Sequence, residues 1–169
     1  DIAIREGTPV MMLEYWNNAA ATKAKFRAAP DGPRWLLTGD RGIVEDGFIR
    51  FVGRDDDVIT SAGYRIGPAE IEDCLITHEA VAQAGVVGKP DPQRTEIVKA
   101  YVVLKSGHAP SPELTESLQS HVKTRLAAYE YPREIEFLDT LPMTVTGKII
   151  RKELRARAIA ETSQISESA

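Results

Sequence analysis

Residues 53–72 read GRDDDVITSAGYRIGPAEIE, and this stretch decides how the chain is divided. Residues 55–57 are three aspartates in a row, and a buried strand would not tolerate three adjacent like charges. Pro68 suits the first turn of a helix, and Glu70 adds negative charge near its positive end. Apolar residues follow at helical spacing. The sequence therefore predicts that one domain ends at residue 55 and a second begins at residue 56.

The second domain, predicted over residues 56–160, combines helices with a small sheet. Apolar runs at residues 81–87, 97–104 and 135–138 predict three strands. A helix is predicted from Pro112, because apolar residues recur there at four-residue spacing. That apolar stripe consists of Leu114, Leu118, Val122 and Leu126. These elements describe an α+β domain with a three-stranded sheet and packed helices.

The end of the chain changes composition twice. Residues 142–151 read PMTVTGKIIR, in which residues 142–147 are predicted to form a loop that leads into a basic helix from Ile149 to about Ala160. Residues 161–169 are acidic and rich in serine, a composition that cannot bury enough apolar surface to fold. We therefore expect a disordered tail there.

Residues 1–55 are predicted to be rich in β-strands. Alternation over residues 1–6 and an apolar run over residues 10–16 indicate one or two strands, and residues 19–28 suit a short helix. An extended segment follows at residues 35–38. Two β-prone runs within residues 43–52 flank Glu45-Asp46-Gly47, whose Asp-Gly pair is typical of a tight hairpin turn.

The composition limits the class of protein. The chain has 169 residues, 43% hydrophobic, which suffices for one compact core and part of a second. The net charge of −4 gives no general attraction to nucleic acid or to an anionic membrane. Cys74, the single cysteine, excludes an internal disulfide, and no secretory signal or membrane span is present, which favours a cytoplasmic location. Because the chain opens on Asp1 without methionine, we expect it to be a piece of a longer protein.

Two short segments carry side chains suited to chemistry on phosphates and sugars. Lys148 follows Gly147 on the predicted loop, where a cation could reach a phosphate. Asp40 ends a predicted strand in Thr38-Gly39-Asp40, and a carboxylate there could accept two hydrogen bonds from a vicinal diol such as ribose. His78, His108 and His121 are scattered without the spacing of metal ligands, so no metal site is predicted.

These segments and residues 53–72, in this order and separation, resemble the closing motifs of the adenylate-forming superfamily. Its members include acyl-CoA synthetases, peptide-synthetase adenylation domains and luciferases. The resemblance covers residues 2–157, and the segments GYRIGPAEIE, DPQR and YPREIEF look most like medium-chain or aryl acyl-CoA synthetases. It implies an AMP-forming ligase that uses ATP, Mg²⁺ and coenzyme A. A carboxylate first becomes an acyl-adenylate, and the thiol of coenzyme A then displaces AMP.

The resemblance also implies a role for individual residues. The small C-terminal domain would be a lid that rotates about Asp56 between the two half-reactions. Lys148 would be the catalytic lysine, which stabilises charge on the reacting carboxylate and phosphate oxygens. The residues that would bind the nucleotide are Asp40, Arg54 and Arg65. The residues that would bind coenzyme A are Ala62, Gly63, Tyr64, Arg94, Lys123, Tyr131, Pro132 and Arg133.

Plainer interpretations of the same residues stay open. Lys148 and Lys123 would be ordinary solvated lysines, Asp40 a turn residue and Arg54 a surface ion pair. The phosphate loop and the acyl pocket of the superfamily are missing, so we expect the chain alone to be inactive without its own large N-terminal domain. One alternative is an adenylation domain that hands its acyl group to a carrier protein. Another is a stand-alone module that binds a nucleotide or coenzyme A.

Overall fold

A computed structural model describes residues 1–30 and 32–167, with side chains to residue 162. The chain divides into two compact units, Asp1–Asp56 and Asp57–Ala169. Within the described residues, no helix is long and apolar enough to cross a membrane.

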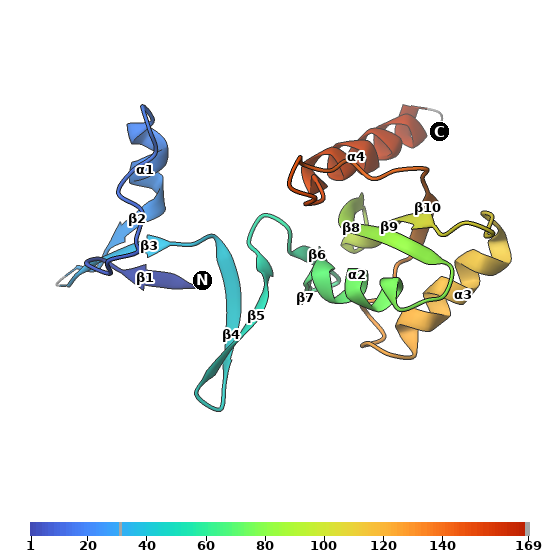
Figure 1. Ribbon diagram of the computed structural model, residues 1–169, viewed down its shortest axis with the longest axis horizontal. Helices are drawn as coiled ribbons and strands as arrows, with labels where there is room; N and C mark the ends of the chain where they lie inside the picture. The colour runs from blue at the N-terminus through green and yellow to red at the C-terminus, as the bar shows by residue number, and fades with distance from the viewer. Residues whose placement is uncertain (31, 168–169) are drawn as a thin grey trace. The chain divides into compact units, whose positions relative to one another are not determined.

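The first unit consists of a small sheet, a short helix and a hairpin (Figure 1). Strands β1 (Ala3–Arg5), β3 (Arg34–Leu37) and β2 (Phe26–Ala28) form an antiparallel sheet in that order. Helix α1 (Ala19–Lys25) precedes β2, and the Asn18 side chain caps it by accepting from the backbone N–H of Ala21 at 3.0 Å.

The hairpin of the first unit pairs β4 (Asp40–Glu45) with β5 (Phe48–Arg54). Its turn residues Asp46 and Gly47 have φ angles of 51° and 82°, as the Asp-Gly pair predicts. Two other predictions for this unit are wrong. Residues 10–16 contain no strand, and the helix ends at Lys25 because Phe26 turns to pair with Leu36.

The second unit is a sheet covered on both faces. Its strands are β6 (Ile59–Ser61), β7 (Tyr64–Ile66), β8 (Val81–Asp91), β9 (Thr95–Leu104) and β10 (Glu134–Phe137). The strand order is β10-β9-β6-β7, with β8 antiparallel to β9 and β10 parallel to β9. The predicted α+β class is confirmed. The described sheet has five strands where three were predicted, because β6 and β7 are too short to give a periodic signal.

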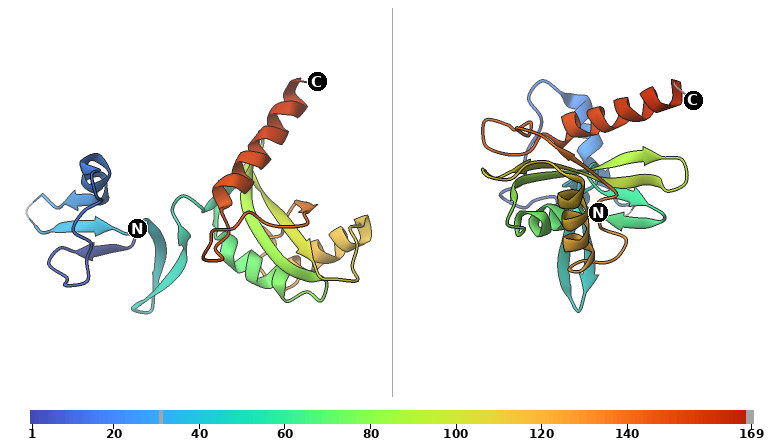
Figure 2. Two further views of the ribbon diagram at one scale, coloured as in Figure 1. Left: turned by 45° about the horizontal axis from the view of Figure 1, so that its top comes forward. Right: turned by 90° about the vertical axis from the view of Figure 1, so that its right-hand side faces the viewer.

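Helices α2 (Pro68–Ile76) and α3 (Pro112–Lys123) cover one face of this sheet, and α4 (Arg151–Glu167) covers the other, as Figures 1 and 2 show. Alternation along β8 and β9 sends Val86 and Val98 into the core with α2 and α3. It sends Val87 and Tyr101 toward Leu154 of α4. Each face of the central strands therefore has its own apolar cluster.

Helix α4 continues past residue 160, where the sequence predicted that it would end. Glu161, which was placed in a disordered tail over residues 161–169, accepts hydrogen bonds from the ammonium groups of Lys99 (2.5 Å) and Lys89 (3.3 Å). Both lysines are nearly buried on the α4 face of the sheet, so a carboxylate opposite them stabilises this turn of the helix. Residues 168–169 of the predicted tail lie outside the described residues.

Candidate functional site

Lys148 lies on the loop between β10 and α4, and its backbone is held in a tight turn. The N–H of Thr144 donates to the carbonyl of Lys148 (2.8 Å), and the N–H of Lys148 donates to Thr144 Oγ1 (3.0 Å). Gly147, with φ of 79°, supplies the left-handed conformation that the turn requires. Next to Lys148, Ile149 packs against the apolar cluster under α4. The backbone of the loop is therefore anchored on both sides of Lys148.

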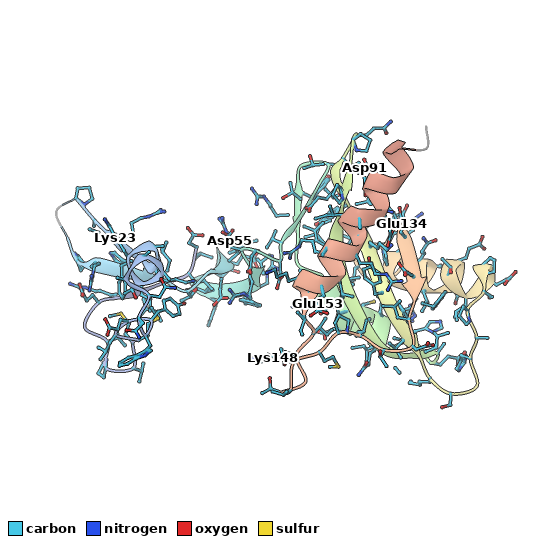
Figure 3. The ribbon with its side chains drawn as sticks, turned by 90° about the horizontal axis from the view of Figure 1, so that it is seen from above. Lys23, Asp55, Asp91, Glu134, Lys148 and Glu153 are labelled. Atoms are coloured by element: carbon cyan, nitrogen blue, oxygen red, sulfur yellow. The ribbon has the colours of Figure 1, made fainter. Side chains whose placement is uncertain are left out.

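The side chain of Lys148 is exposed, in contrast to its anchored backbone. Figure 3 shows it projecting from the loop near the start of α4. Among the described residues, no acid or hydrogen-bond acceptor pairs with its ammonium group. This arrangement presents a cation on a fixed backbone and leaves its charge available to an anionic ligand.

A cluster of charged side chains that no sequence motif predicted begins directly after this loop. Arg151 donates twice to Glu72, through Nε to Oε1 (3.1 Å) and through Nη2 to Oε2 (2.5 Å). It also donates to Asp57 at 3.3 Å, and Arg155 donates to the same carboxylate at 3.0 Å. Glu72 in turn accepts from the backbone N–H of Val86 at 2.9 Å. The cluster joins α4, α2 and the first residue of the second unit.

The turn between β6 and β7 contains the predicted coenzyme A residues Ala62 and Gly63. Both have positive φ angles, 49° and 86°, although alanine rarely adopts this conformation. The N–H of Ala62 donates to the carbonyl of Arg94 at 2.9 Å, so three predicted residues meet here. A Cβ atom added to Gly63 would have no neighbour within 4 Å, so the chain offers an open path to this backbone.

Aromatic rings and cations lie together on the segment that follows α3. The Tyr131 ring has the Lys123 ammonium 5.5 Å and the Arg133 guanidinium 5.2 Å from its centroid. Pro132 between them is buried. The ring of Tyr64 stacks on Tyr129, with centroids 4.0 Å apart and planes at 9°. Tyr129 was not among the predicted residues, although the repeated tyrosines of YEYPR were a usable signal.

The predicted nucleotide-binding residues are divided between the two units. Asp40 and Arg54 are cross-strand partners in the β4–β5 hairpin of the first unit, with 3.9 Å between their charged groups. Arg54 Nε also donates to Oδ1 of Asp56, the predicted hinge residue, at 3.0 Å. About half of the Arg54 side chain is exposed, so these ion pairs are weak and an anionic ligand can replace them. Arg65 lies exposed on β7 of the second unit.

The remaining polar candidates have partners inside the fold. His121 contacts the hydroxyl of Thr77 (2.8 Å), and His78 contacts that of Ser117 (3.2 Å). Cys74 is buried, and burial raises the pKa of its thiol, which disfavours a nucleophilic role. In the part of the chain that the structure describes, no three His, Cys, Asp or Glu side chains are grouped closely enough to hold a metal ion.

Comparison with known proteins shows what the chain is similar to. Residues 70–148, ending at Lys148, match the AMP-binding enzyme C-terminal domain. The chain is 53% identical over 167 residues to the human mitochondrial acyl-coenzyme A synthetase ACSM1, covering 97% of this chain and 28% of that protein. It is 47% identical over 157 residues to acetyl-coenzyme A synthetase of Bacillus subtilis, covering 92% of this chain and 27% of that protein.

Solved structures show the same similarity. A benzoate CoA ligase from Burkholderia xenovorans LB400 superposes with a TM-score of 0.68 at 40% identity, covering 85% of this chain and 27% of that one. The chain thus spans little more than a quarter of the length of these relatives. The predicted resemblance is confirmed: residues 70–148 match the AMP-binding enzyme C-terminal domain, and the chain is similar to the C-terminal part of acyl-CoA synthetases.

Proposed function

We propose that the protein containing this chain is an AMP-forming acyl-CoA synthetase, and that this chain supplies its catalytic lysine and its coenzyme A face. The reaction would convert a carboxylate, ATP and coenzyme A into acyl-CoA, AMP and pyrophosphate. The observation that carries the proposal is the exposed Lys148 ammonium on an anchored backbone, at the end of the matched domain. The resemblance favours a medium-chain or aryl carboxylate as substrate; the similarity to a benzoate CoA ligase supports an aromatic acid, and the similarity to acetyl-coenzyme A synthetase makes a short acid the other case to test.

In the adenylation step, Lys148 would act by electrostatics. Negative charge accumulates on the carboxylate and α-phosphate oxygens as the new bond to phosphorus forms, and an ammonium group close to them lowers the barrier. A fixed backbone with a long, unpaired side chain suits this role, because only the side chain must be ordered when the ligand binds. Asp40 and Arg54 would hold the nucleotide from the first unit. Mg²⁺ would accompany the phosphates of ATP and stays a prediction for the whole enzyme.

In the thioester step, the second unit would hold coenzyme A. The open backbone at Gly63 suits close passage of the narrow pantetheine arm. Lys123 and Arg133 beside Tyr131 place two cations where the phosphates of coenzyme A could bind, which an otherwise acidic protein requires. A carrier protein would present the same pantetheine arm without the nucleotide phosphates. These two cations therefore favour free coenzyme A as the acceptor.

The test is adenylation by the whole protein, followed as pyrophosphate exchange with a panel of short, medium-chain and aromatic acids. Lys148→Ala should lower the exchange rate about 10²- to 10³-fold, the loss typical when one preorganised charge donor is removed. Thioester formation from supplied acyl-adenylate should be preserved. Lys152→Ala is the matched control, because Lys152 is also an exposed lysine and lies four residues away on α4.

Two outcomes would count against the proposal. Equal exchange rates in the wild-type protein and in Lys148→Ala would mean that the lysine has no catalytic role. Absence of exchange with every acid in the panel would contradict the ligase activity itself. The 169-residue chain on its own should give no exchange, because it lacks the phosphate loop that the resemblance requires. The predicted cytoplasmic location stays a prediction.

A further inference from the structure

The turn between β6 and β7 adopts a conformation that its own residues do not favour. It joins two strands of three residues each, and so short a hairpin is not stable by itself. Ala62 has a φ of 49°, where its Cβ crowds the following backbone. Contacts from outside the hairpin must therefore hold the turn in place.

The first of these contacts comes from the loop between β8 and β9. The Asp91 carboxylate accepts from the N–H groups of Gln93 (3.0 Å) and Arg94 (2.8 Å), which fixes this loop. The carbonyl of Arg94 then accepts from Ala62. The next residue, Thr95, also has a positive φ of 71°, which is rare for a β-branched side chain. The hydrogen bond thus joins the strained Ala62 to the residue directly before the strained Thr95.

The second contact is the stack of Tyr64 on Tyr129. Tyr129 lies in a turn that is fixed independently, because Glu130 both donates through its N–H to the carbonyl of Ala127 and accepts from the N–H of Ala127, each at 2.9 Å. The two rings are 50% and 42% exposed, so they belong to the surface rather than to the core. A parallel stack at 4.0 Å on a fixed base restrains the rotamer of Tyr64 and the backbone next to it.

We propose that Tyr129 is a positioning residue for the thioester-forming half-reaction, and that it acts by holding the 62–64 turn ready for coenzyme A. This inference rests on the proposed function, in which that turn borders the pantetheine arm. When a binding-competent turn is only partly populated, the apparent affinity for the ligand falls in proportion to that population. The stack keeps the turn ordered before coenzyme A arrives, which reduces the ordering that binding requires.

The experiment compares Tyr129→Ala and Tyr129→Phe in the whole protein, with the two half-reactions measured separately. Tyr129→Ala should raise the KM for coenzyme A about 2- to 12-fold, the range that one aromatic stack accounts for, and should leave pyrophosphate exchange unchanged. Tyr129→Phe keeps the ring and should behave as wild type. An unchanged KM in Tyr129→Ala, or equal losses in both half-reactions, would overturn the inference.

A second measurement needs no activity and uses the 169-residue chain. The Ala62 amide proton is hydrogen-bonded to Arg94, and it should exchange with solvent faster in Tyr129→Ala but not in Tyr129→Phe. Equal exchange in all three proteins would overturn the inference even if the enzyme is active. If wild-type protein shows neither half-reaction, the proposed function fails, whereas the exchange result still decides whether Tyr129 holds the turn.

Discussion

Replacing Arg151 with methionine should destabilise the second unit by about 3 kcal/mol. Removing one partner of a buried ion pair costs about 3–5 kcal/mol, because the other charge is left without compensation. The Glu72 side chain is 9% exposed and that of Arg151 is 23% exposed, so some water reaches the pair and the lower end of that range applies. Asp57 keeps its contact with Arg155 in the variant. Methionine fills a similar volume, which limits the contribution from a cavity.

The assay is urea unfolding of the 169-residue chain, followed by far-ultraviolet circular dichroism. Helices α2, α3 and α4 belong to the second unit and only the short α1 to the first, so most of the helical signal reports the second unit. Tryptophan fluorescence would report the other unit, since Trp16 and Trp35 both lie there. Arg157→Met is the matched control. Arg157 is on the same helix, but its ion pair with Glu136 has side chains 52% and 27% exposed and should contribute less than about 1 kcal/mol.

The comparison between these two variants shows whether the buried ion pair of Arg151 contributes more stability than the exposed ion pair of Arg157. If Arg151→Met and Arg157→Met lose the same stability, the buried ion pair between Arg151 and Glu72 contributes no more than a surface pair. A loss confined to Arg151→Met supports the view that the start of α4 depends on this cluster.

Two further predictions concern the packing of α4. Gly85→Ala should destabilise the second unit by about 1–3 kcal/mol, because the added Cβ would lie 2.7 Å from Leu154 Cδ1. Thermal unfolding measures this loss, and unchanged stability would show that α4 can shift to make room for the methyl group. Burial raises the pKa of Glu161, but hydrogen bonds from Lys99 and Lys89 outweigh it and lower this pKa below 4.5. Wild type should therefore be more stable than Glu161→Gln above pH 4.5, and this difference should disappear as the pH falls below 4.5. A difference in melting temperature that persists in acid would contradict the prediction.

Local chemistry explains which parts of the fold the sequence predicts. The β4–β5 turn follows from Asp46 and Gly47, and the start of α2 follows from Pro68, because each signal acts within a few residues. The strands β6 and β7 gave no such signal, since three residues are too few to show alternation. Residues 10–16 are apolar but contain no strand, because an apolar run alone does not specify a pairing partner.

The residues of the candidate site also fall into those that a local motif predicts and those that it does not. Lys148 and the 62–64 turn were identified because each belongs to a short motif. The charged cluster next to Lys148 was missed, because its members meet across long stretches of chain: Arg151 contacts Glu72 across 79 positions and Asp57 across 94. No local pattern predicts such contacts. The extended end of α4 was missed for the same reason, since the lysines opposite Glu161 come from distant strands.

The location of the buried cluster bears on how the proposed lid would move. Asp57 is the first residue of the second unit, and Arg151 and Arg155 hold it there. On the other side, the N–H of Asp55 donates to the carbonyl of Gly39 within the first unit at 2.8 Å. Asp56, the predicted hinge residue, is the one residue between these two anchors, and its role as a hinge stays a prediction.

The same cluster would make Lys148 move with the hinge. Arg151 lies three residues beyond Lys148 and forms an ion pair with Asp57, so the Lys148 loop is tied within the second unit to the residue after the predicted hinge. A change of backbone angle at Asp56 would then carry Lys148 as a unit with the sheet and its coenzyme A residues. The resemblance implies a lid that rotates about Asp56 between the two half-reactions, and this coupling would keep Lys148 and the predicted coenzyme A residues together during that rotation.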